Sequence, residues 1–289
     1  MKARLMEDAL QFGDNFIRNA SYYFVSWDYF YRGLFKQARE SAARLIASGH
    51  ESSDPRAIGV ANWILAGIDL VSGAPEAAIL RADECLRVAI SPFDRLQGSI
   101  IKAVANIFLG RVREGLTSVE ALNVEFARLG ALYSVLDGPR GVALILLGRI
   151  NEGIRVIEKA ITERDTIGDH TSAAFARVPL AEIYIQILTG GTRRPSMKAL
   201  RENWRFLIGA KLTGARRARV LLEQAAAHKQ LFAHGAILAR INYNLGVLFM
   251  IKRKRVKARA YLERARDAAL IQEEAAMVER IDAALAKVA

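Results

Sequence analysis

The residues best suited to bind a partner include an aromatic cluster near the start of the sequence. Eight of the 23 aromatic residues fall within residues 22–35. If this stretch is helical, residues spaced three and four apart share one face. That face carries Tyr23, Trp27, Phe30 and Tyr31. Rigid aromatic side chains are effective anchors at protein interfaces, so this stripe could form a groove or a contact with another domain.

The same aromatic cluster has a purely structural interpretation. Residues 1–20 could form a preceding helix whose Leu10, Phe12 and Phe16 cover one aromatic stripe. Tyr22 lies on another face of the expected helix, so both faces carry aromatic side chains that are more stable when buried. The sequence therefore leaves open whether the cluster belongs to the core or to a groove.

A second candidate surface is strongly basic and falls in one quarter of the chain. Residues 190–260 carry 17 basic side chains and two acidic ones, whereas the net charge of the whole chain is +12. The candidate contacts are Arg193, Arg194, Arg201, Arg205, Arg216, Arg217, Lys252, Arg253, Lys254 and Arg255. Charges this close require distant carboxylates, ions or an anionic partner to neutralise them.

The basic block has several interpretations. It could be a solvated ridge, or it could dock an acidic protein domain. It could also bind an anionic membrane surface, with Trp204, Phe206 and Leu207 beside Arg201 and Arg205. Nucleic acid is the least favoured partner, because base stacking requires exposed aromatic residues interleaved with the charge and this block has few.

The sequence offers no constellation typical of catalysis or of a resident metal or cofactor. Neither a Gly-x-x-x-x-Gly-Lys-Ser/Thr phosphate-binding loop nor a Gly-x-Ser-x-Gly nucleophile elbow occurs. The four histidines lack the spacing that places two of them and a glutamate on one helix face. Cys85 falls where two helices should pack closely, which favours a small buried hydrophobe. We expect no enzyme activity, no metal and no cofactor.

The elements that position these residues are predicted to be helices. Apolar residues recur at intervals of three and four rather than alternating as they do in a strand. The segment Leu109–Gly115 is repeated by Leu147–Gly153 at an offset of 38 residues. Gly33 and Gly73 extend this series towards the N-terminus. Each repeated unit is therefore expected to be a helix, a turn and a second helix.

We predict an all-α fold, a single right-handed α-α superhelix of about six helical hairpins over residues 1–289. The expected units are residues 1–50, 55–91, 92–130, 131–168, 170–230 and 236–289. The fifth unit contains an insertion over 190–212, with an added helix at 197–211. Stacking of neighbours would bury the apolar face that a lone hairpin exposes. Because Pro179 lies inside an apolar run, that helix is expected either to start near Val178 or to kink.

The helical pattern resembles the tetratricopeptide repeat. The last unit follows the order of that family's signature with Asn244, Leu245, Gly246, Phe249, Ala258, Leu262 and Ala265. Residues 131–168 match more loosely, and the first three units are degenerate. The units also run longer than the family consensus. The resemblance implies a concave, protein-binding face. In the last unit its contacts would be Arg240, Tyr243, Val247 and Met250.

A wider resemblance covers roughly residues 55–289. The segment 183–190, an Arg-Arg-Pro triplet, the 203–207 helix, the Asn-Leu-Gly unit and the 280–286 ending follow one another in this order. This order is similar to the C-terminal repeat region of bacterial multidomain signalling proteins. In those proteins a class III adenylate or guanylate cyclase domain and a nucleotide-binding ATPase domain precede the repeats. The resemblance implies a regulatory region rather than a catalytic one.

The sequence as a whole favours a non-catalytic protein-binding module or regulatory scaffold. Its partner would be a peptide or an adjacent domain. The alternative is an electrostatic binder of an anionic membrane surface or nucleic acid through residues 190–260. A single cysteine, the acidic residues near the N-terminus and the lack of a long uncharged apolar run favour a cytoplasmic location.

Overall fold

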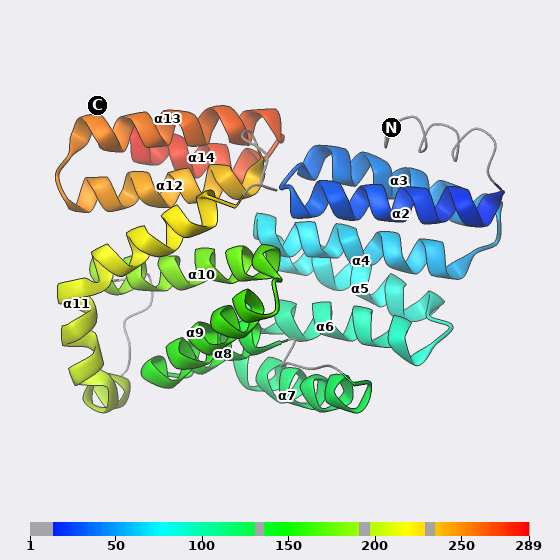
Figure 1. The fold of residues 1–289 in the computed structure, drawn as a ribbon, viewed down its shortest axis with the longest axis horizontal. Coiled ribbons are helices and arrows are strands. Elements are labelled where there is room, and N and C mark those ends of the chain that lie inside the picture. The colour runs from blue at the N-terminus through cyan, green and yellow to red at the C-terminus, as the bar shows by residue number, and fades with distance from the viewer. Residues whose placement is uncertain (1–13, 131–135, 191–196, 229–234, 289) are drawn as a thin grey trace. The chain divides into compact units, whose positions relative to one another are not determined.

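The fold is helical throughout the residues that the computed structural model describes, which are 14–130, 136–190, 197–228 and 235–288 (Figure 1). These residues form thirteen helices, labelled α2 to α14, and no strand. Successive helices pack against each other as hairpins. The predicted all-α array of helical hairpins is confirmed. The chain divides into two compact units, residues 1–118 and 119–289.

The first unit is a series of hairpins. Its helices are α2 (Asn15–Tyr31), α3 (Phe35–Glu51), α4 (Pro55–Ser72), α5 (Pro75–Val88), α6 (Pro92–Phe108) and the start of α7 (Val112–Arg128). Each helix from α2 to α6 contacts the next, and α4 also contacts both α2 and α6. The first helices of successive hairpins therefore lie side by side, which is how stacked hairpins bury their shared face.

The second unit begins within α7, at Val119, and has the same design. Its helices are α8 (Asp137–Leu146), α9 (Ile150–Thr166), α10 (His170–Thr189), α11 (Met197–Ala226), α12 (Ala236–Ile251), α13 (Arg255–Ile271) and α14 (Ala275–Leu285). Helix α10 contacts α9, α11 and α12, and α13 packs against both α12 and α14. The stretch expected to be the last hairpin thus holds three helices.

Local sequence signals explain where many helices begin. Pro55, Pro75 and Pro92 each occupy the first turn, where the missing N–H of proline costs no helical hydrogen bond. Helix α6 also begins with a capping box. The Ser91 hydroxyl accepts a hydrogen bond from the Asp94 backbone N–H, and the Asp94 carboxylate accepts one from the Ser91 N–H.

The repeated glycines identified in the sequence lie in the turns inside the hairpins. Gly33, Gly73, Gly110 and Gly148 have φ angles of 75°, 85°, 88° and 87°. This left-handed conformation strains residues that carry a Cβ, which explains the glycine series. In the turn between α12 and α13 the left-handed residue is Arg253, with φ 54°. Its hairpin turn therefore carries a charge at a position that glycine would fill with less strain.

Small residues lie where paired helices approach most closely. A Cβ on Gly246 of α12 would lie 2.8 Å from the Leu262 side chain of α13. Ala258 and Ala265, on the same side of α13, are fully buried. These small residues allow α12 and α13 to approach closely.

Helix α10 begins earlier than one of the sequence alternatives predicted. It starts at His170, so Pro179 lies inside it and the predicted start near Val178 is wrong. The reason is a side-chain cap, because the Asp169 carboxylate accepts a hydrogen bond from the Ser172 backbone N–H at 3.1 Å. A capped first turn sustains the helix although Pro179 removes one internal hydrogen bond.

The inserted helix expected at 197–211 is the first half of a longer one. Helix α11 runs without interruption for 30 residues, and Figure 1 shows it changing direction along its length. Gly209 and Gly214 do not end it, because a glycine inside a helix costs only about 1 kcal/mol relative to alanine. Gly214 is buried, and a Cβ there would lie 3.4 Å from the Tyr184 ring of α10.

Candidate functional site

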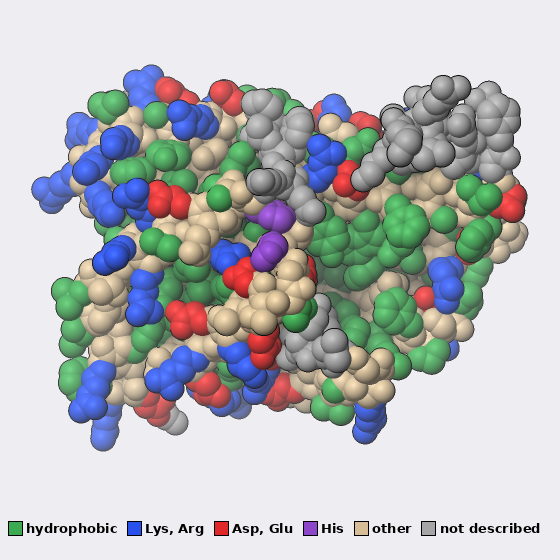
Figure 2. Space-filling model, viewed as in Figure 1, with side chains coloured by type: hydrophobic (Ala, Val, Ile, Leu, Met, Phe, Trp, Pro, Cys, Tyr) green, Lys and Arg blue, Asp and Glu red, His purple; other side chains and the backbone are tan. Residues whose placement is uncertain are grey.

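Helices α2 and α4 bring five aromatic side chains together on the first unit. The Trp27 ring stacks on Tyr31 with centroids 5.0 Å apart, and it meets Trp63 of α4 edge-on at 4.5 Å. Tyr23 lies 6.4 Å from Trp27, and Phe24 lies 5.0 Å from Tyr23. We call these five residues the aromatic face. Figure 2 shows hydrophobic side chains gathered over α2 and α4.

Part of the aromatic face is exposed. Phe24 is 66% exposed and Tyr31 is 36% exposed, whereas Trp27 is half-buried between its neighbours. The indole Nε1 of Trp27 is buried and has no hydrogen-bond acceptor among the described residues. Exposed apolar side chains gathered on one face are typical of a surface that contacts a partner.

The four residues that the sequence predicted to form one stripe do not all lie on the aromatic face. Phe30 points inward, because its ring stacks on the buried Phe35 at 5.8 Å and lies 3.5 Å from the Cβ position of Gly67. Sequence reasoning missed Phe24 and Trp63. Phe24 could have been identified from the sequence, because a helix that begins at Asn15 places it on the same side as Tyr31. Trp63 could not, because it lies on another helix and nothing in its local sequence indicates this contact.

The prediction that residues 1–20 form a separate helix covering an aromatic stripe is wrong in one respect. Helix α2 itself begins at Asn15, because the Asp14 carboxylate accepts a hydrogen bond from the Ile17 N–H at 2.9 Å. Phe16 therefore lies on the same helix as the aromatic face and is 78% exposed, so it does not cover that face from a separate helix. Leu10 and Phe12 lie outside the described residues.

One of the contacts expected in the last unit, Arg240, is held in an ion pair. Its guanidinium donates two hydrogen bonds to the Glu182 carboxylate of α10, at 2.6 and 2.5 Å. Asn244 donates a third at 2.8 Å. Burial by itself would raise the pKa of Glu182, but the charge and hydrogen bonds of Arg240, together with Asn244, lower it. Arg240 therefore joins α12 to α10.

The other expected contacts on α12 also take part in packing. Tyr243 and Met250 pack against the buried core shared by α12, α13 and α14. The Arg280 guanidinium lies 5.1 Å from the Tyr243 ring centroid. Val247 is half-buried on the same helix. A binding role for these residues stays a prediction.

The basic block is only partly neutralised within the protein. Arg217 donates a hydrogen bond to the Tyr184 hydroxyl at 3.0 Å, and its guanidinium lies 3.6 Å from the Glu158 carboxylate. A carboxylate distant in the sequence therefore neutralises part of the block, as expected. The other predicted contacts that are described are exposed and form no ion pair with a described carboxylate: Arg201, Arg205, Arg216, Lys252, Arg253, Lys254 and Arg255. Arg193 and Arg194 lie outside the described residues.

The apolar residues expected beside this charge are not all exposed. Phe206 and Leu207 are half-buried, whereas Trp204 is 53% exposed. The side chains that share the outward side of α11 with Trp204 are Ile208 and Leu212, at 53% and 80% exposure. The prediction that Trp204, Phe206 and Leu207 form one exposed group is therefore wrong. Residues four apart lie on one face of a helix, so Ile208 and Leu212 accompany Trp204 instead.

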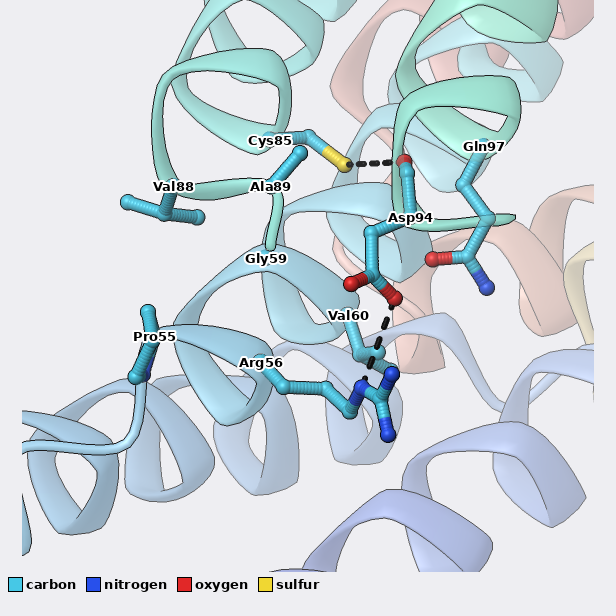
Figure 3. Close-up of a pocket in the computed structure, with 9 residues that line it drawn as sticks. All are labelled: Pro55, Arg56, Gly59, Val60, Cys85, Val88, Ala89, Asp94 and Gln97. Atoms are coloured by element: carbon cyan, nitrogen blue, oxygen red, sulfur yellow. Dashed lines mark hydrogen bonds and ion pairs between the residues drawn. The ribbon is translucent and has the colours of Figure 1, made fainter. Parts of the chain in front are cut away.

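Cys85 is buried in the first unit, among close-packed residues that leave no room for a water molecule (Figure 3). Its Sγ points towards the backbone carbonyl oxygen of Asp94, 3.9 Å away. The Asp94 carboxylate in turn lies 3.4 Å from the Arg56 Nε. Burial and the negative charge of Asp94 raise the pKa of Cys85 to about 11. These surroundings disfavour the thiolate that nucleophilic chemistry requires.

Cys85 is expected to react slowly with thiol reagents in the folded chain. At a pH of about 8, its raised pKa and its burial should make alkylation at least about 100-fold slower than in the unfolded chain. The rate of iodoacetamide labelling, with and without urea and read by mass spectrometry, measures this. Equal rates in both states would show that the thiol is accessible and reactive.

The described residues contain no group of three or more His, Cys, Asp or Glu side chains suited to hold a metal ion. Among the described helices, none is both long enough and apolar enough to cross a membrane.

Comparison with protein-family models finds no matching family, and comparison with curated proteins finds no match to the chain.

Proposed function

We propose that this chain is a non-catalytic protein-binding module that holds an apolar protein segment on the aromatic face of its first unit. The single observation that carries this proposal is the partly exposed ring cluster around Trp27, whose indole N–H lacks an acceptor among the described residues. A bound segment would cover the exposed rings of Phe24 and Tyr31, and burial of aromatic area is a main source of interface energy.

The surroundings of the aromatic face favour an apolar partner over a charged one. Asp28, on the same helix, is paired with Arg32 at 3.3 Å, so these two charges offset each other. The rings also hold one another through stacked and edge-on contacts. Such mutual support lowers the conformational entropy lost on binding.

We extend the proposal to a regulatory, cytoplasmic role. The tetratricopeptide-like order of small residues and the wider resemblance to the repeat region of cyclase and ATPase signalling proteins support it. In this role the chain, either as a free adaptor or as part of a larger regulator, presents its helical hairpins to a peptide or an adjacent domain.

Affinity capture with the full chain at low and high salt tests the proposed function. The decisive variant is Phe24→Ala with Tyr31→Ala, which truncates two of the exposed rings and leaves Trp27 and Trp63 packed together. We expect a captured protein that withstands high salt with the wild type and is reduced at least about ten-fold with this variant.

The matched control is Leu80→Ala with Ile90→Ala, which removes side chains of 72% and 62% exposure away from the aromatic face. It should capture the partner like the wild type, and circular dichroism should show equal helicity for all variants. Capture that high salt abolishes and the aromatic variant leaves intact would contradict the proposal.

A further inference from the structure

The outward side of the first half of α11 is apolar where a surface helix is normally polar. Met197 and Leu212 are each 80% exposed, and Trp204 and Ile208 are each 53% exposed. Leu200, at 37%, completes the series. These positions recur at spacings of three and four, so they form one stripe about 22 Å long. We call these five residues the apolar stripe.

The apolar stripe lies opposite the side of α11 that packs on the protein. On that inner side Asn203 is 6% exposed. Its side-chain amide donates a hydrogen bond to the Gly148 carbonyl at 2.7 Å, and its side-chain oxygen accepts one from the Asn151 N–H at 3.1 Å. These bonds fasten α11 to the turn between α8 and α9, so the stripe is held facing outward.

Basic side chains flank the apolar stripe. Arg201, Arg205, Lys211 and Arg216 are exposed, and none of them forms an ion pair with a described carboxylate. The Arg205 guanidinium lies 5.2 Å from the Trp204 ring centroid. Figure 2 shows hydrophobic side chains along the outer edge of α11, at the lower left of the view, with Lys and Arg side chains beside them.

This arrangement is typical of a helix that lies in a membrane interface. Apolar side chains enter the boundary of the acyl chains, tryptophan prefers the headgroup level, and arginine and lysine reach lipid phosphates with their long stems. A convex row of side chains on one helix needs no shape-matched partner to insert into lipid. The unpaired positive charge selects an anionic surface.

We propose that the first half of α11 docks on an anionic lipid surface, with the apolar stripe inserted and the flanking arginines and lysine at the headgroup phosphates. The stripe belongs to the second unit and the aromatic face to the first. Lipid docking therefore adds to the proposed function and does not rest on it, and the two can fail separately.

Vesicle binding by the full chain tests this proposal. The probes are phosphatidylcholine vesicles with and without phosphatidylglycerol, with co-sedimentation as the measure of affinity. We expect binding at least about ten-fold tighter to the anionic vesicles, because several basic residues near such a surface each add to the attraction. The tryptophan emission should shift to shorter wavelength on binding, and Trp204→Phe should remove most of that shift.

Two variants separate insertion from charge. Ile208→Ser with Leu212→Ser should weaken vesicle binding at least about ten-fold, because two inserted apolar side chains are lost. Arg201→Gln with Arg205→Gln should weaken binding to anionic vesicles by about ten-fold. Both pairs are exposed, so folding is preserved. Leu80→Ser with Ile90→Ser, which changes exposed apolar residues of the first unit, should bind like the wild type.

Three results would overturn the lipid proposal. They are equal binding to both kinds of vesicle, absence of binding to either, and full binding by the Ile208→Ser, Leu212→Ser variant. Light scattering accompanies each measurement. Self-association that this variant abolishes, without vesicle binding, would assign the apolar stripe to a second copy of the chain instead.

Discussion

Replacement of Gly153 by alanine is expected to lower the free energy of unfolding of the second unit by about 3 kcal/mol. A Cβ at this position would collide with the Gly141 carbonyl oxygen and would lie 2.6 Å from the Ile145 Cγ1. The approach is reciprocal, since a Cβ on Gly141 would lie 2.6 Å from the Gly153 carbonyl oxygen. Backbone atoms cannot move aside alone, so α8 and α9 would have to separate.

Urea unfolding followed by circular dichroism measures this loss. The matched control is Gly209→Ala in α11, where a Cβ would meet no heavy atom of the described chain within 4 Å. That variant should gain about 1 kcal/mol from the better helix propensity of alanine. Similar effects of the two substitutions would mean that α8 and α9 do not approach as closely as the structure shows.

Replacement of Glu182 by glutamine is expected to lower the free energy of unfolding by about 2 kcal/mol. The Glu182 and Arg240 side chains are only 20% and 31% exposed, so the variant leaves a poorly solvated guanidinium without its counter-charge. The matched control is Asp282→Asn, which breaks the more exposed pair with Arg266. Its cost should stay below about 1 kcal/mol because water screens that pair.

The contribution of Glu182 should also depend on pH with a definite sign. Its pKa in the folded chain is below its ordinary value of 4.5, so folding favours the charged carboxylate. The stabilisation is complete above pH 4.5 and is lost as the pH falls through the lower pKa of the folded state. The stability difference between the wild type and Glu182→Gln should therefore shrink in acid. A difference that is constant with pH would contradict this account.

The sequence predicts the helical hairpins because their signals are local. Glycines at Gly33, Gly73, Gly110 and Gly148 mark the turns, and proline or a short polar side chain marks many helix starts. The small residues of the last hairpin also follow a fixed spacing along their own helices. Each of these signals lies within a few residues of the structure that it determines.

Contacts between distant segments explain what the sequence does not predict. Glu182 and Arg240 are 58 residues apart, and nothing in either neighbourhood indicates the ion pair. Likewise, the direction in which Phe30 points depends on Gly67 and Phe35 of neighbouring helices. The apolar stripe of α11 has a helical spacing, but only the fold shows which of its sides faces the core. Sites that depend on packing between helices thus require the structure.

The most direct test of the central claim, that the aromatic face binds protein, is photo-crosslinking from position 24 in cells that normally produce the chain. Benzoylphenylalanine in place of Phe24 would stand among exposed rings of the aromatic face, and the same probe in place of Leu80 serves as the control. We predict discrete crosslinked protein products from position 24 and none of them from position 80. The same products from both positions, or no discrete product from position 24, would contradict the claim.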